Sequence, residues 1–135
     1  MDIPELDYAF LAEFASIQNG TLTAVGASYT TIRVPEFPFL QDLYVAGRVR
    51  KPAGHGVIPI EAVISTPTQG DAEIGISGAL SPKPNELPYD GKVGTFFVIH
   101  TYLQLNGPGL YVINLEIDGR PARRLAFESL LIAEP

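Results

Sequence analysis

Few side chains in this sequence are of the types that commonly perform catalysis. The 135 residues include two histidines and no cysteine, which excludes thiol nucleophiles, disulfides and thiolate metal sites. His55 lies in the turn sequence PAGHG, whereas His100 lies in a predicted strand. The two are too far apart to form the His-x-His or His-x3-His pairs that often bind metals. We therefore expect His100 to be half-buried or to face a partner.

The sequence around Ser77 comes close to the nucleophile elbow of serine hydrolases. In GISGA, residues 75–79, Ala79 stands where the G-x-S-x-G pattern requires glycine, and a loop follows instead of a helix. We interpret Ser77 as an ordinary strand serine. We predict no catalytic residue and expect a protein that is not an enzyme; a hydrolase using His55 or His100 is the weakest alternative.

Carboxylates could bind calcium if the loops of a β-sandwich brought several of them together. The candidates are two close pairs and two loop acids, namely Asp71 with Glu73, Glu116 with Asp118, and Asp42 and Asp90. None has the dense spacing that supplies enough oxygen ligands to a hard cation. We interpret them as solvated charges near strand ends and predict no metal and no cofactor. A small-ligand or calcium-binding sandwich is the alternative function.

Two groups of basic residues could bind anions. They are Arg48, Arg50 and Lys51 with His55 nearby, and Arg120, Arg123 and Arg124. Arg48 and Arg50 share a strand face, from which they could contact a phosphate or a carboxylate. The net charge of −6 and the few aromatic residues among these bases disfavour nucleic-acid binding. Solvated strand faces are the simpler interpretation.

Glycine and proline divide the chain into segments of strand length, which is typical of an all-β domain. The predicted strands cover 6–18, 21–34, 43–51, 57–66, 72–80, 93–105, 110–117 and 122–132. Asn19-Gly20 and Asp118-Gly119 predict hairpin turns, although residues 5–17 also fit a helix. We predict one domain over residues 1–135, a single β-sandwich of about eight mostly antiparallel strands. A Greek-key or immunoglobulin-like arrangement is favoured, and a barrel is the alternative.

Four features of the sequence allow further predictions about strand position, bends and loops. Strand 93–105 has apolar residues on both faces, so it should lie centrally or present one face to a partner. Pro59 predicts an edge position or a bulge, and Gly26 a bulge or bend. Residues 81–92 read as one long loop.

The stretch GPGLYVINLEIDG, residues 107–119, predicts a structural corner. Gly109-Leu110-Tyr111 has the form of a tyrosine corner, in which a buried tyrosine donates a hydrogen bond from its hydroxyl to the backbone of the preceding turn. Tyr111, Ile113, Leu115 and Ile117 form the expected buried face, and they alternate with Val112, Asn114, Glu116 and Asp118. This signal indicates a fold and no activity.

Three segments together resemble a small family of bacterial and actinophage single-domain proteins of unknown function. They are LDYAFLAEFASIQNGTLTAVG at 6–26, TTIRVPEFP at 30–38 and GPGLYVINLEIDG at 107–119. The resemblance implies a β-sandwich; it implies no activity and carries over no site residues.

The opening residues MDIPELDYAF carry acids where a secretory signal carries lysine or arginine, and no apolar run approaches the length of a membrane helix. We therefore expect a cytoplasmic protein, or one assembled into a particle, with no membrane insertion. The leading hypothesis is a non-enzymatic interaction or structural module in a homo-oligomer or larger assembly. Its partner would be another protein or a second copy of the chain.

Overall fold

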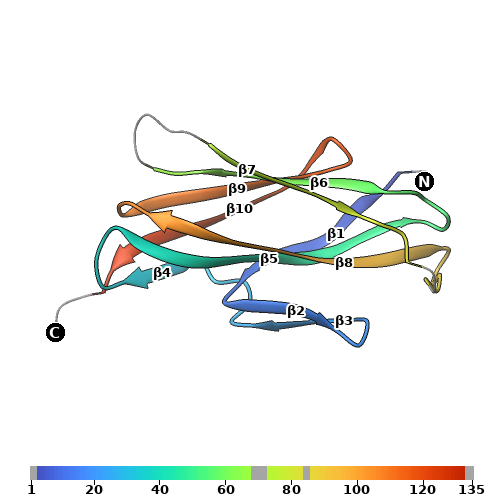
Figure 1. The fold of residues 1–135 in the computed structure, drawn as a ribbon, viewed down its shortest axis with the longest axis horizontal. Helices are drawn as coiled ribbons and strands as arrows, with labels where there is room; N and C mark the ends of the chain where they lie inside the picture. Colours follow the sequence, from blue (N-terminus) through green and yellow to red (C-terminus); the bar gives the residue numbers. More distant parts are fainter. Residues whose placement is uncertain (1–2, 68–72, 84–85, 133–135) are drawn as a thin grey trace.

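The protein is built from β-strands throughout the part of the chain that the structure describes. The structure is a computed structural model, and it describes residues 3–67, 73–83 and 86–132. The strands are β1 (Glu5–Ala12), β2 (Phe14–Gln18), β3 (Thr21–Val25), β4 (Thr31–Val34), β5 (Phe39–Pro52), β6 (Ile58–Ser65), β7 (Ile74–Leu80), β8 (Lys92–Leu105), β9 (Gly109–Ile117) and β10 (Arg120–Leu131) (Figure 1). No helix among these residues is long and apolar enough to cross a membrane.

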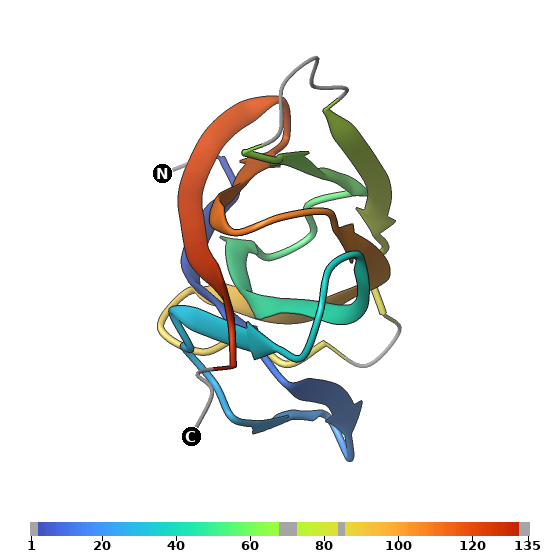
Figure 2. The same cartoon turned by 90° about the vertical axis from the view of Figure 1, so that its left-hand side faces the viewer.

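Two sheets enclose one hydrophobic core. One sheet has the order β1-β5-β8 and the other the order β4-β10-β9-β6-β7. Alternate residues of each strand point inward, so that Val45 and Phe97 of the first sheet join Ile60, Ile113 and other residues of the second in a single cluster. Seen end-on, the strands surround this core (Figure 2). The residues predicted by alternation to face inward are all buried, namely Leu43, Val45 and Val49 in strand 43–51, Ile58, Ile60, Ala62 and Ile64 in strand 57–66, and Tyr111, Ile113, Leu115 and Ile117 in strand 110–117.

A third sheet, the β2–β3 hairpin, lies outside the other two (Figures 1 and 2). The chain leaves the three-stranded sheet at Glu13, and the hairpin packs against the outer face of that sheet. Three buried alanines, Ala12, Ala15 and Ala46, form the contact, because small side chains let the two layers approach closely. The all-β class is confirmed, but the prediction of about eight strands in a single sandwich was wrong, because the described residues form ten strands in three sheets.

A central position was one of the two alternatives predicted for strand 93–105, and it was wrong, because β8 is an edge strand. Among the described strands it pairs only with β5. Its second apolar face is explained by the hairpin, since Val98 packs against the alanine contact under β2. Both faces of an edge strand can be covered when a separate layer packs on the outside of the sheet.

The structure also shows the conformation of the first segment, of the predicted turns and of Gly26. Residues 5–17 form strands and not a helix. The predicted turns at Asn19-Gly20 and Asp118-Gly119 are confirmed, with positive φ at both residues of each pair. A further turn of this kind, Asp90-Gly91, closes a bridge between Tyr89 and Lys92 inside the segment read as a loop. Gly26 makes a bend after β3 at φ 61°.

The expectation that Pro59 marks a sheet edge was wrong. β6 lies between β7 and β9. Pro59 is the second residue of the strand and pairs with Ala79 of β7, but the register with β9 begins one residue later, at Ile60. A proline is accommodated there because its missing N–H costs no ladder hydrogen bond to β9.

The tyrosine corner is present. Tyr111 is fully buried, and its hydroxyl donates a hydrogen bond of 2.9 Å to the carbonyl oxygen of Gly107. Gly109 is required in the turn because its φ is +130° and a Cβ there would lie 2.9 Å from Pro67. The ring of Tyr111 stacks on Phe127 at a centroid distance of 5.1 Å.

A second tyrosine, Tyr29, contacts the same phenylalanine, but its hydroxyl is not hydrogen-bonded to any described residue. The ring of Tyr29 meets Phe127 edge-on at 6.1 Å. Its hydroxyl oxygen is buried and has no hydrogen-bond partner. Burial first, and the nearby Glu13 carboxylate second, raise the pKa of Tyr29 from 10.0 to about 12.

We expect Tyr111→Phe to lower the free energy of unfolding by about 1 kcal/mol, because it removes a buried hydrogen bond and leaves the Gly107 carbonyl without its donor. Chemical denaturation measures this change. Tyr29→Phe is the matched control: it contacts the same Phe127 but should leave stability unchanged or increased, since the removed hydroxyl has no partner. Equal losses in the two variants would contradict the assignment of the corner bond.

Tyr29 also predicts how stability depends on alkaline pH. Its raised pKa means that the folded state favours the neutral phenol, so this stabilisation is complete below pH 10 and is lost as the pH rises through about 12. Urea denaturation over this range should show a steeper decline for the wild type than for Tyr29→Phe. Identical slopes would show that ionisation of Tyr29 is not coupled to unfolding.

Candidate functional site

The most distinctive concave surface lies between the free edges of the two main sheets. β7 ends the five-stranded sheet, and β8 ends the three-stranded sheet; Figure 2 shows β7, in olive, at the outer margin of its sheet. A groove of about 560 Å³ lies between them, lined by residues 76–83 and 95–100 together with Ile17 and Ile60. We call it the β7–β8 groove.

The lining shows that the groove runs along strand edges. A hollow on the face of a sheet is lined by every second residue of a strand, because successive side chains point to opposite faces. Here consecutive residues line it on both sides, 76–80 in β7 and 95–100 in β8. A strand presents consecutive residues only along its edge, where backbone N–H and C=O groups are unpaired.

The groove is apolar and contains no carboxylate among its lining residues. Its walls include Ile60, Ile76, Phe97 and Ile99, which belong to or pack against the core. Gly78 leaves space in front of Ile60, since a Cβ built on it would lie 3.7 Å from that side chain. The ionisable lining residues are Lys83 and His100. This composition contrasts with the net charge of −6 of the whole chain.

Ile17 of the hairpin joins the groove to a second hollow. This hollow, of about 370 Å³, is lined by Ile17, Lys83, Glu86, Leu87 and others around the start of β8. Leu87 is 85% exposed. The two hollows share Ile17, Lys83, Thr95 and Phe96, so an apolar surface continues along the edge of β8.

His100 lies at one end of the groove and is paired with an acid. Its Nε2 is 3.0 Å from Oδ1 of Asp42, and its ring stacks on Tyr44 with centroids 4.1 Å apart. Tyr102, which is 64% exposed, extends this group on the outer face of the three-stranded sheet. His100 is thus an exposed surface residue with an orienting carboxylate. No described serine forms a hydrogen bond with it.

The other residues considered for catalysis are separated from one another. Ser77 also lines the β7–β8 groove, but its hydroxyl donates to Glu61 at 3.4 Å. His55 is in a turn, where its Nδ1 lies 3.1 Å from the carbonyl of Gly56. In the described ranges no histidine, serine and acid come together as a nucleophile with its base.

The acids are also dispersed. Glu73 accepts a hydrogen bond from Ser65, and Asp90 lies 3.8 Å from Arg50. Glu116 of β9 lies opposite Glu61 of β6 in the register of the two strands. Asp118 occupies the β9–β10 turn, and Asp71 lies outside the described residues. Within the part of the chain that the structure describes, no three potential metal ligands form a group.

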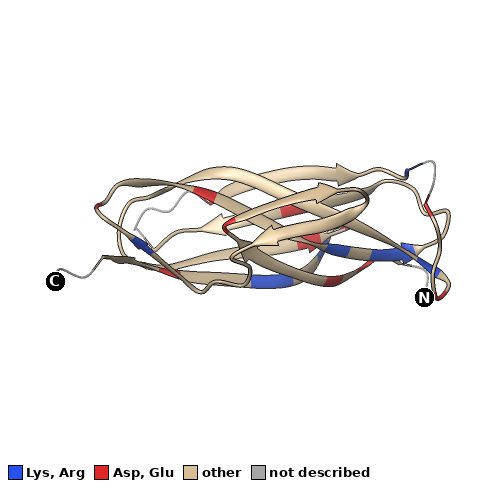
Figure 3. Ribbon diagram, turned by 90° about the horizontal axis from the view of Figure 1, so that it is seen from below, with Lys and Arg blue, Asp and Glu red and all other residues tan. Residues whose placement is uncertain are grey.

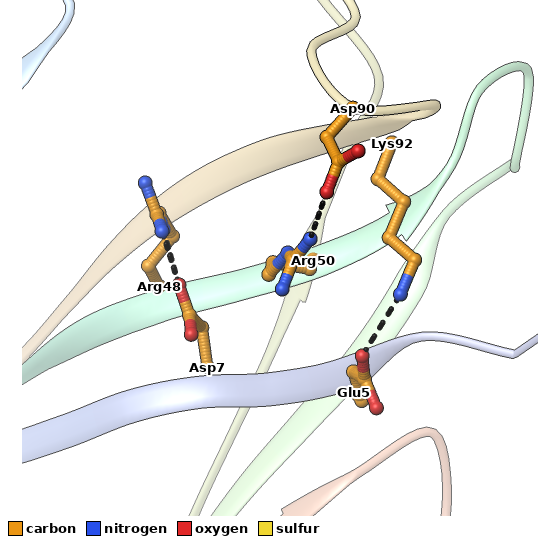
Figure 4. Close-up of polar contacts among 6 residues, drawn as sticks. All are labelled: Glu5, Asp7, Arg48, Arg50, Asp90 and Lys92. Carbon is orange, nitrogen blue, oxygen red and sulfur yellow. Dashed lines mark hydrogen bonds and ion pairs between the residues drawn. The ribbon is translucent and has the colours of Figure 1, made fainter.

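The first basic cluster is neutralised by acids of the same chain (Figure 4). Arg48 donates to Asp7 from Nε at 2.7 Å, and this bond raises the pKa of Arg48. Its guanidinium also lies over the rings of Tyr8 and Tyr89. Arg50 pairs with Asp90, and Lys92 with Glu5 at 3.1 Å. These ion pairs therefore link β5 to β1 and to the turn before β8, and the start of β8 to β1.

Lys51 belongs to the same run but points into the protein. It is 1% exposed, and its Nζ lies 3.2 Å from Oε2 of Glu86. The contact is an ion pair without a well-aligned hydrogen bond. Glu86 also accepts a long bond of 3.5 Å from Thr95. Glu86 is thereby connected to both β5 and β8.

The second basic cluster lies on the outer face of the other sheet. The register of β9 and β10 shifts between Pro121 and Arg123, and Arg123 and Arg124 come to line one hollow. Neither forms an ion pair with a described residue. Glu73 and Glu116 line the same hollow, so its net charge is balanced. In Figure 3 most basic positions lie toward the end of the molecule that holds the N-terminus, with acidic positions close to them.

A family model described as "Family of unknown function (DUF6941)" matches residues 7–128 of the chain. The chain belongs to this family. The resemblance to a family of unknown function is thereby confirmed, while an origin in bacteria or phages stays a prediction. No curated protein matches this DUF6941 chain.

One similar solved structure is that of the Pseudomonas fluorescens alkylpurine DNA glycosylase AlkC, bound to DNA containing an abasic site analog. The TM-score is 0.54 and the identity 10%, over 96% of the DUF6941 chain but 31% of the glycosylase. This likeness shows a shared fold. The chain spans about a third of that protein's length, and no residue role passes between them.

Sequence reasoning did not find the β7–β8 groove. It identified most of the residues that line it, including Ser77 and His100, but as members of separate strands. Two signals were available: glycines at positions 75 and 78 of one short strand, and the two-sided apolarity of residues 93–105. Neither shows that β7 and β8 face one another, because that depends on strand order.

We expect this DUF6941 chain not to bind duplex DNA, with or without an abasic site analog, in fluorescence anisotropy at low salt. Its first basic cluster is already paired with acids. The double variant Glu5→Gln/Asp7→Asn is the control: it frees Lys92 and Arg48, so it should acquire weak, salt-dependent binding. Tight binding by the wild type would contradict the assignment of these pairs to a structural role.

Proposed function

We propose that this protein is a non-enzymatic interaction or structural module with an immunoglobulin-like β-sandwich scaffold. It would act as a subunit of a homo-oligomer or of a larger assembly, through contact with a second copy or with another protein. The observation that carries the proposal is the β7–β8 groove, which combines free backbone edges with an apolar lining. Soluble β-proteins normally protect such edges, and an uncovered one favours pairing with another chain.

The chemistry of the described residues supports binding over catalysis. His100 has a carboxylate partner, but no described hydroxyl is placed to receive activation from it. Ser77 is bonded to Glu61 instead. Exposed apolar side chains also gather near the groove, with Ile17 at 39%, Ile74 at 41% and Leu87 at 85% exposure. Apolar surface of this kind typically marks a protein-binding region.

The alternative is a small-ligand or calcium-binding sandwich, and its calcium-binding form gains no observation in its favour. The loop acids at Asp42 and Asp90 each face a base of this chain. The described part of the chain holds no group of three potential metal ligands. We therefore develop the interaction module alone.

The mass of the endogenous protein in a native extract of its own cells tests this function. We expect the chain to elute in a particle well above its 14.6 kDa monomer mass. Lys83 lines the groove, so an amine-reactive cross-linker should join it to another polypeptide. Lys92, which is paired with Glu5 at the other end of the first basic cluster, is the internal control and should cross-link less.

A protein that runs as a strict monomer in this extract, with no intermolecular cross-link at Lys83, would contradict the proposed function. Cross-links confined to lysines outside the groove would retain an interaction module but place its contact elsewhere.

A further inference from the structure

We propose that the β7–β8 groove binds an extended segment of a different protein, which adds as a strand between β7 and β8 and hydrogen-bonds to both. This inference rests on the proposed function and specifies its partner. It follows from the spacing of the sheets, the lining of the groove, its charge and the pairing state of the chain's own strands.

The spacing of a β-sandwich suits one inserted strand. Facing sheets lie about 10 Å apart, and hydrogen-bonded strands lie about 4.8 Å apart. β7 and β8 end different sheets, and no described residue of one pairs with the other. A gap of about 10 Å would place one added strand within pairing distance, about 4.8 Å, of each edge. The added strand would join the two sheets along this side of the core.

Backbone groups for such pairing are present on both edges. Among the described strands β7 pairs with β6 alone and β8 with β5 alone, so alternate residues of each strand have N–H and C=O groups that are not used by a neighbouring strand at the edge that borders the groove. The lined part of β8 covers residues 95–100, which is about 20 Å of extended chain. This length accommodates a segment of about six residues in strand conformation.

The lining determines which side chains the segment should carry. In an added strand, every second side chain points toward the core side and the others point to solvent. The core side of the groove is formed by Ile60, Ile76 and Phe97. Gly78 provides room there, because it contributes no side chain in front of Ile60. The segment should therefore be apolar at every second position.

Charge restricts the segment further. Lys83 and His100 are the ionisable residues of the lining, and it includes no acid. The chain as a whole has a net charge of −6, so this groove is a neutral to basic surface on an acidic protein. Acidic residues are favoured at the solvent-facing positions of the segment because their negative charge complements Lys83, and uncharged residues also suit these positions because they do not repel it.

A second copy of this chain does not fit the groove as well. All ten strands in the described part of the chain are already paired within it. If β7 or β8 of another copy paired with its counterpart, one sheet would be extended and the opposite edge would stay open. A free extended segment can satisfy both edges at once, which is why we assign the groove to a different protein.

The test uses a displayed library of random peptides as the probe and two matched variants of the full chain. Gly78→Val places a side chain in the groove, at ordinary contact distance from Ile60. Gly75→Val lies on the same strand outside the groove, where an added Cβ meets nothing within 4 Å. Neither glycine has a positive φ, so both variants should fold; thermal unfolding checks this.

We expect the wild type and Gly75→Val to enrich peptides with apolar residues at alternate positions and few bases. Gly78→Val should bind the same peptides about tenfold more weakly or worse, as expected when a buried anchor position is filled. Hydrogen exchange with a selected peptide bound should show new protection at alternate amides of both β7 and β8, because both edges become paired.

Four outcomes would overturn the inference. The library yields no enriched peptide, or the two glycine variants bind the peptides equally well. The amides of only one edge or of neither edge become protected, or they become protected without peptide because the chain dimerises. Binding in the groove without amide protection removes the strand addition but leaves the interaction module intact. The interaction module itself fails only if the native extract also yields a monomer without cross-links at Lys83.

Discussion

The structure depends on the separation that two sheets must keep to bury side chains between them. Side chains such as Phe97, Leu103, Tyr111 and Phe127 fill the space between the inner faces, and this holds the sheets about 10 Å apart. At that distance the outermost strands of the two sheets cannot share hydrogen bonds. The open edges of β7 and β8 are therefore a consequence of the core itself. What distinguishes this protein is that the opening has an apolar lining and few charges to protect it.

The outer surface of the three-stranded sheet is covered by a hairpin in one region and carries ion pairs in another. The β2–β3 hairpin covers the middle of the three-stranded sheet through small alanine contacts. The face near the start of β1 carries arginines and lysines whose charges are balanced by Asp7, Glu5 and Asp90. These arrangements stabilise the chain internally, so they account for features that would otherwise suggest an anion site or an oligomer face. The β7–β8 groove is not accounted for in this way, and it is the surface on which the proposed function rests.

Much of the fold followed from local signals in the sequence. Alternation of apolar and polar residues identified the inward residues of β5, β6 and β9, since one face of each strand must reach the core. Asn-Gly and Asp-Gly pairs located two hairpins because few other residues accept positive φ at both turn positions. Tyr111 indicated its corner for the same kind of local reason. The errors concern relations between strands: a central position was predicted for β8, as an alternative to a partner-facing one, because both of its faces are apolar, and an edge or a bulge was predicted at Pro59 because prolines in sheets usually lie there.

By itself the sequence determined the all-β class, the positions of the main strands and turns, and the absence of cysteine chemistry, because these follow from residue type and from spacings of a few positions. It also identified Arg48, Arg50, Ser77 and His100 as side chains worth examining. Only the tertiary structure decided their roles, since the acids that pair with Arg48 and Arg50 lie about forty residues away along the chain. It also decided which strands end the sheets. Strand order depends on how all ten strands pack together, and no local stretch of sequence encodes it; the groove between β7 and β8 exists only at that level.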